Sequence, residues 1–150
     1  MTLSKKSPIL IAEDDPDDRL LILEALEENK LASNIRFVED GEELMNYLLQ
    51  TGKYTESTDS PRPSLILLDL NMPKKDGREA LKEIKNIPSL KQIPVVVLST
   101  SQTHEDISYG YSMGGNSYIT KPSSYKNLVE VMKSLGEFWF RVAKLPSASL

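Results

Sequence analysis

Short apolar runs alternate with longer charged segments along the whole chain. Three of the runs are wholly apolar, at residues 8–12, 65–68 and 95–98. Short runs of this kind are typical of strands that are buried on both faces of a sheet. Two further short segments, residues 34–38 and 118–120, also predict strands.

The segments between these strands predict helices, at residues 19–28, 41–49, 78–85, 104–113 and 125–142. Pro88 ends the third helix, and Gly114 and Gly115 end the fourth. Strands and helices in strict alternation predict an α/β fold, with a parallel sheet covered by helices on both faces. The stretch 51–63 is rich in Gly, Pro, Ser and Thr and predicts an exposed loop.

Length and composition narrow the class of protein. A chain of 150 residues predicts a single domain over 1–150, with a core at about 7–142. The net charge of -4 disfavours nucleic acid as a partner. The absence of cysteine and the single histidine exclude disulfides and multi-histidine metal sites. No apolar run approaches the roughly 20 residues that span a bilayer, so we expect a cytoplasmic protein without a membrane partner.

Polar residues follow four of the predicted strands: Glu13, Asp14 and Asp15, then Asp69, then Ser99 and Thr100, then Lys121. In a doubly wound sheet, ligands bind outside the carboxyl ends of the strands. Crowded carboxylates repel one another, and a hard cation such as Mg²⁺ relieves that repulsion through oxygen ligands. Asp14 and Asp69 are direct candidate ligands, Glu13 is a direct or water-mediated one, and a backbone carbonyl near Asn71 is another.

The remaining groups suit a phosphoryl anion. The Asp69 carboxylate is a candidate nucleophile that would form an aspartyl phosphate. Lys121 would supply positive charge and Ser99 a hydroxyl donor. Taken singly, the acidic residues after the first strand read as helix caps and Lys121 as a surface lysine. Their convergence on one edge of the sheet favours the functional interpretation.

The segments 9–15, 65–73, 94–100 and 118–122, with Asp76 and Gly77, together resemble the receiver domain of bacterial two-component response regulators. The resemblance runs from about residue 7 to residue 135. It implies a flavodoxin-like fold with strand order 2-1-3-4-5. It also implies that Asp69 accepts a phosphoryl group from a sensor histidine kinase, and that the chain is not a metabolic enzyme.

The resemblance also implies a role for each residue at this edge. Glu13, Asp14, Asp69 and the backbone of Asn71 would hold Mg²⁺, and Lys121 would contact the phosphoryl group. Ser99 and Tyr118 would form the switch, and the peptide bond between Lys121 and Pro122 would be cis. The chain departs from the commoner family pattern in having Glu at 13 and Ser at 99. No second domain is expected to follow, so we expect no output domain.

The C-terminal helix carries more aromatic residues than one core-facing stripe needs. Phe138, Trp139 and Phe140 are consecutive, and one helix cannot turn all three into its own core. Phe138 and Trp139 therefore predict an interface and a homodimer, with burial inside the monomer as the alternative. This ending resembles the small response regulators that partner cyanobacterial phytochromes, which implies a light-regulated histidine kinase as the phosphoryl donor.

Three other functions remain as alternatives. A haloacid-dehalogenase-type phosphatase would carry its nucleophile after the first strand, and a nucleotide binder would need a phosphate-cradling loop there. A pseudo-receiver would bind proteins without taking a phosphoryl group. His104, the only histidine, is expected to lie exposed in the first turn of a helix rather than to act as the phosphoryl donor.

Overall fold

The computed structural model describes residues 8–31, 34–56 and 60–142. Its centre is a five-stranded parallel sheet in the order β2-β1-β3-β4-β5, which confirms the predicted class and strand order. The strands are β1 (Ile9–Ala12), β2 (Ile35–Val38), β3 (Leu65–Leu68), β4 (Val95–Ser99) and β5 (Ser117–Thr120). Every residue of β1, β3 and β4 is buried, as their apolar sequences require.

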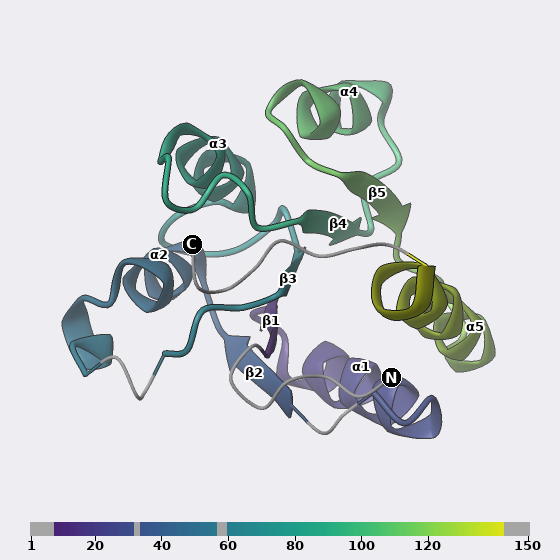
Figure 1. The fold of residues 1–150 in the computed structure, drawn as a ribbon. Coiled ribbons are helices and arrows are strands. Elements are labelled where there is room, and N and C mark those ends of the chain that lie inside the picture. The colour runs from purple at the N-terminus through teal and green to yellow at the C-terminus, as the bar shows by residue number, and fades with distance from the viewer. Residues whose placement is uncertain (1–7, 32–33, 57–59, 143–150) are drawn as a thin grey trace.

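In the described part of the chain, five α-helices cover the two faces of the sheet (Figure 1). They are α1 (Pro16–Glu28), α2 (Gly41–Leu49), α3 (Gly77–Asn86), α4 (His104–Ser112) and α5 (Tyr125–Glu137). Helices α1 and α5 lie on one face, and α2, α3 and α4 lie on the other. Successive strand residues point to opposite faces, so Leu10 and Ala12 join the core under α2 and α3, whereas Ile9 and Ile11 join the core under α1 and α5.

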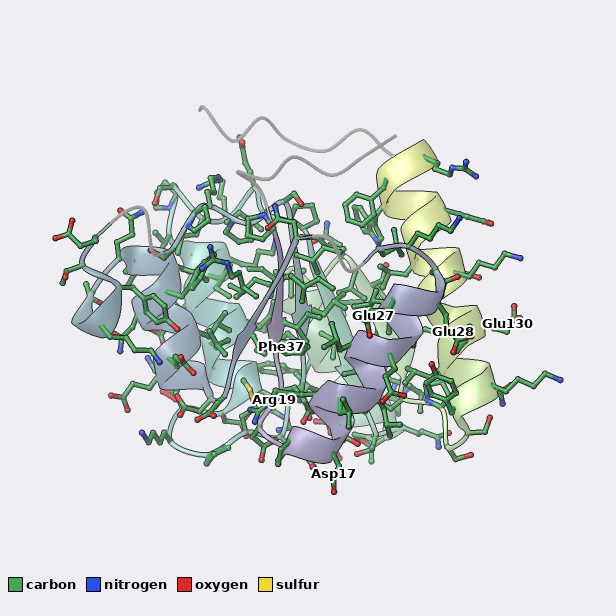
Figure 2. All side chains as sticks on the ribbon, turned by 90° about the horizontal axis from the view of Figure 1, so that it is seen from below. Asp17, Arg19, Glu27, Glu28, Phe37 and Glu130 are labelled. Carbon is green, nitrogen blue, oxygen red and sulfur yellow. The ribbon has the colours of Figure 1, made fainter. Side chains whose placement is uncertain are left out.

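Helices α1 and α5 run side by side, with Glu28 of α1 near their seam (Figure 2). The Asn29 side-chain amide at the end of α1 donates to the Val129 carbonyl of α5 at 3.0 Å. A hydrogen bond between Tyr125 and Glu28 joins the same two helices. This seam fixes the position of α5, whose C-terminal end carries the aromatic residues.

Local capping explains where the helix bounds differ from the prediction. Helix α1 begins at Pro16 rather than residue 19, because the Asp15 carboxylate accepts a hydrogen bond from the Asp17 backbone N–H at 2.8 Å and Pro is tolerated in the first turn. The predicted last helix ends as an α-helix at Glu137 and continues as a π-helical segment, η4 (Phe138–Val142).

The predicted loop at 51–63 is only partly exposed. It contains a short 3-10 helix, η2 (Gly52–Tyr54), and Pro63 is buried. The Tyr47 hydroxyl donates to the Pro61 carbonyl at 2.8 Å, and the rings of Tyr47 and Tyr54 meet edge to face. Tertiary contacts with α2 therefore draw this segment inward. Residues 57–59 of the loop, and residue 7 of the predicted core, lie outside the described residues.

The described part of the chain contains no cis peptide bond, so the expected cis bond between Lys121 and Pro122 is wrong. The trans form is the lower-energy isomer of such bonds by about 0.5–1 kcal/mol. None of the described helices has both the length and the apolar character needed to cross a membrane.

Candidate functional site

Two buried acids lie side by side because two neighbouring strands end together. Ala12 of β1 pairs with Leu68 of β3, so Glu13 and Asp69 leave the sheet at the same level. The Asp69 backbone N–H donates to the Ala12 carbonyl at 3.1 Å, and the Glu13 backbone N–H donates to Val38 at 3.0 Å. Backbone hydrogen bonds thus hold both residues at the carboxyl edge, as the sequence predicted.

Lys121 reaches this edge from the end of β5. Its backbone N–H donates to the Ser99 carbonyl at 2.8 Å, which extends the pairing of β4 and β5. Its Nζ lies 3.1 Å from Asp69 Oδ2 and 3.2 Å from Asp18 Oδ2, and it forms an ion pair with Glu13. One ammonium group therefore contacts three carboxylates from two different segments.

Burial makes this arrangement electrostatically demanding. The Glu13 side chain is 2% exposed and that of Asp69 is 9% exposed. Burial raises the pKa of Glu13 to about 7, although the hydrogen bond and charge of Lys121 act in the opposite direction. For Lys121, burial favours the neutral amine, but the contacts with Glu13 and Asp69 outweigh it and raise the pKa above its usual value.

The acidic cluster has the composition of a divalent-cation site. One carboxylate oxygen from each of Glu13, Asp14 and Asp69 lies within 4.8 Å of the others. Oxygen-only ligands suit hard cations such as Mg²⁺ and Mn²⁺. The Asn71 backbone N–H donates to Asp69 Oδ1 at 3.1 Å, so this residue lies beside the cluster, and its carbonyl as a ligand stays a prediction.

The two predicted switch residues lie on β4 and β5 and meet a common neighbour. Ser99 is fully buried, and its Oγ accepts a hydrogen bond from the Ser101 backbone N–H at 3.2 Å. The Tyr118 hydroxyl donates to the Ser101 carbonyl at 2.8 Å, and its ring lies against Gly110. Ser101 therefore joins Ser99 to Tyr118.

Two contributors were missed by the sequence interpretation. Asp18 was among the acidic residues after the first strand that read as helix caps, yet its carboxylate contacts Lys121. It lies in the first turn of α1, four residues after Asp14, and that spacing was the available signal. Gly77 packs so closely that a Cβ there would lie 2.2 Å from the Asp69 carbonyl oxygen. The Asp76-Gly77 pair at the start of α3 therefore lets this helix approach the backbone of Asp69.

The C-terminal aromatic residues take three different environments. Phe140 is buried, Trp139 is partly buried, and Phe138 is 51% exposed. The rings of Phe138 and Trp139 meet edge to face at 5.1 Å. Both line a groove between β5 and α5, together with Ser117, Ile119, Glu130, Val131, Ser134 and Leu135. His104 is exposed in the first turn of α4, as predicted.

Comparison with known proteins establishes the class that this fold and acidic edge define. The sequence profile of the response regulator receiver domain matches residues 9–133, most of the chain. The chain therefore belongs to the response regulator receiver domain family.

Particular relatives cover nearly the full chain. The response regulator Rcp1 of Synechocystis sp. is 44% identical, over 93% of this chain and 93% of that protein. A phosphorylated cyanobacterial phytochrome response regulator, RcpA, is 48% identical and superposes with a TM-score of 0.86, covering 94% of this chain and 99% of that one. The Mn²⁺-bound form of Rcp1 superposes with a TM-score of 0.85 at 42% identity, with the same coverage.

Replacing Lys121 with methionine is expected to lower the free energy of unfolding by about 3 kcal/mol, because it leaves the buried Glu13 carboxylate without its cation. Urea denaturation at pH 8 in EDTA measures the effect. The double variant Glu13→Gln/Lys121→Met should recover part of the loss, since the most deeply buried carboxylate is then neutral while Asp69 still lacks its cation. Lys126→Met on the exposed surface of α5 is the control, with an expected change within about 0.5 kcal/mol. A loss of stability in the double variant equal to that in Lys121→Met would contradict the charge argument.

Proposed function

We propose that this chain is a phosphoryl-accepting response regulator, in which Asp69 receives the phosphoryl group of a sensor histidine kinase. The observation that carries the proposal is the contact of Lys121 Nζ with Asp69 at 3.1 Å, beside Glu13 and Asp14. A carboxylate that is held between a cation and a metal-type acidic cluster suits phosphoryl transfer, which depends on positioning and charge neutralisation. The alternative of a pseudo-receiver would not require this complete set.

The proposed reaction exchanges one phosphorus bond for another. An Asp69 carboxylate oxygen forms a bond to phosphorus while the bond from phosphorus to the donor's histidine nitrogen breaks, and that nitrogen keeps the electron pair. Lys121 contacts the phosphoryl oxygens, and the Ser99 hydroxyl donates to another of them. The chain then catalyses only its own phosphorylation and the hydrolysis that reverses it.

Mg²⁺ is the proposed cofactor, held by Glu13, Asp14, Asp69 and the Asn71 carbonyl. The support is the oxygen-only cluster in this chain and the Mn²⁺ bound by the relative Rcp1. When bound, the cation neutralises phosphoryl charge. The chain's own part is to keep two of these carboxylates buried and fixed by backbone hydrogen bonds.

Apolar side chains beside the site offer a docking surface for the donor kinase. Leu20 and Leu21 on α1 are 55% and 40% exposed. Leu21 and Lys121 line one small groove, so a partner that covers α1 also reaches the phosphoryl-accepting edge. The relative RcpA, a cyanobacterial phytochrome response regulator, supports a phytochrome histidine kinase as this donor.

Treatment with acetyl phosphate and Mg²⁺ is expected to add one phosphoryl group, a mass gain of about 80 Da by intact-protein mass spectrometry. Asp69→Asn should abolish the gain because the nucleophile is removed. Asp15→Asn, which changes the neighbouring cap, is the matched control and should keep it. A wild-type chain without any gain would favour the pseudo-receiver, and sustained turnover of phosphoesters would favour a phosphatase.

Mg²⁺ is expected to stabilise the fold by about 2–3 kcal/mol at 100 times its dissociation constant, because it binds only the folded acidic cluster. Chemical denaturation with and without Mg²⁺ measures this difference. Asp14→Ala should remove the increment, whereas Asp17→Ala, an exposed acid of α1 outside the cluster, should leave it unchanged. Equal Mg²⁺ stabilisation in the two variants would show that the metal assignment is wrong.

We also propose a homodimer through the groove between β5 and α5. The support is the exposed Phe138 ring, its contact with Trp139, and the apolar residues that line the groove with them. Tyr118 lies between Ser117 and Ile119 on β5 but points to the opposite face of the strand, so a shift of β5 at the switch would carry phosphorylation at Asp69 to the groove.

Phe138→Ala is expected to weaken self-association about tenfold or more, because an aromatic residue at the centre of an interface often contributes over 1 kcal/mol. Light scattering over a range of protein concentrations measures the association. Leu49→Ala on α2 is the control, since Leu49 has a similar exposed fraction of 45% on another face. A monomeric mass for the wild type at every concentration would remove the dimer from the proposal.

A further inference from the structure

Ser101, in the loop between β4 and α4, is joined by hydrogen bonds to Ser99, Tyr118 and Asp106, and its hydroxyl also contacts Thr103. Its backbone N–H donates to Ser99 Oγ at 3.2 Å, and its carbonyl accepts from the Tyr118 hydroxyl at 2.8 Å. Its own hydroxyl donates to Asp106 Oδ2 on α4 at 2.6 Å. The position of Ser101 therefore fixes the rotamer of Ser99, and Asp106 anchors Ser101 from outside the sheet.

Asp106 is in turn held by an arginine from another helix. Arg78 on α3 donates from Nε to Asp106 Oδ1 at 2.9 Å and from Nη2 to Oδ2 at 2.8 Å, a two-point contact. The Arg78 and Asp106 side chains are 29% and 19% exposed, so water competes only partly. The Arg78 guanidinium and the Ser101 hydroxyl lower the pKa of Asp106 to about 2, which keeps the pair charged at neutral pH.

The remaining guanidinium nitrogen of Arg78, Nη1, contacts two residues of the segment that follows Asp69. Nη1 lies 3.1 Å from Asp76 Oδ2 and 3.4 Å from Asn71 Oδ1. The Asn71 backbone N–H donates to Asp69 Oδ1. Through the Asn71 side chain, Arg78 therefore contacts the residue that orients the nucleophile. A continuous chain of polar contacts thus runs from Asp69 through Arg78 and Asp106 to the Ser99 hydroxyl.

We propose that Arg78 and Asp106 are positioning residues for phosphoryl transfer, which hold the Ser99 hydroxyl and the Asp69 carboxylate in a fixed mutual orientation. This proposal rests on the proposed function. Neither residue contacts Asp69 or Lys121, so both act through Ser101 and Asn71. Small misplacements of reacting groups slow enzymatic reactions strongly, so loss of this orientation should lower the phosphorylation rate. An isolated exposed ion pair, by contrast, would contribute little to stability and nothing to the rate.

The rate of phosphorylation by acetyl phosphate in saturating Mg²⁺, monitored by intact-protein mass spectrometry, tests the role of Arg78 and Asp106. Arg78→Gln and Asp106→Asn should each lower the maximal phosphorylation rate about tenfold. The acetyl phosphate concentration that gives half of the maximal rate should change little. The double variant should be no slower than either single one, because the two residues act as a unit. Ser101→Ala removes the hydroxyl contacts with Asp106 and Thr103 but keeps the backbone contacts with Ser99 and Tyr118, so it should reproduce the loss in part. Arg78→Lys should restore part of the rate.

Glu83→Gln is the matched control, because it also removes an ion pair of α3. Glu83 on α3 pairs with Lys75, and in the described part of the chain neither residue forms a hydrogen bond or ion pair with the loop after β4. It should phosphorylate at the wild-type rate. Thermal melts of each variant separate a positioning role from loss of the fold. Three results would overturn the proposal, provided that the wild type is phosphorylated. The Arg78 and Asp106 variants could react as fast as the wild type or faster, or the effects of the two substitutions could add. The phosphorylation rates of the variants could also simply follow their melting temperatures. A wild type that takes no phosphoryl group overturns instead the function on which it rests.

Discussion

The contact of one buried ammonium group with several carboxylates governs this structure. Lys121 lies within 3.2 Å of Asp69 and Asp18 and pairs with Glu13, at an edge where Glu13 and Asp69 are buried. Without that cation, buried carboxylates at the ends of adjacent strands would repel one another and favour protonation. The fold keeps them there because backbone hydrogen bonds, rather than side-chain preference, set where each strand ends.

The parallel sheet makes this concentration of charge possible. Strands that run in one direction bring all of their carboxyl ends to one edge, so residues distant in sequence become neighbours. The apolar faces of β1, β3 and β4 are buried between two helical layers, which gives that edge a rigid support. A site that transfers a phosphoryl group gains from such support, since its chemistry depends on fixed positions and compensated charge.

Two routes lead outward from the acidic edge. One passes through Ser101 to Tyr118 on β5, whose ring packs against Gly110 of α4. The other passes through Arg78 on α3 to Asp106 on α4 and returns to the same serine. Because both routes converge on one short loop, a change at Asp69 and a change at the helix surface can influence each other.

The sequence by itself determined the alternation of strands and helices, because buried strands need short apolar runs and helix ends need caps such as Asp15. It also placed Asp69 and Lys121 at strand ends. Only the tertiary structure decided the contact of Asp18 with Lys121, the inward packing of the loop after α2, and the contact between Arg78 and Asp106. These depend on how helices pack across the sheet, and long-range packing leaves no periodic signal in the order of the residues.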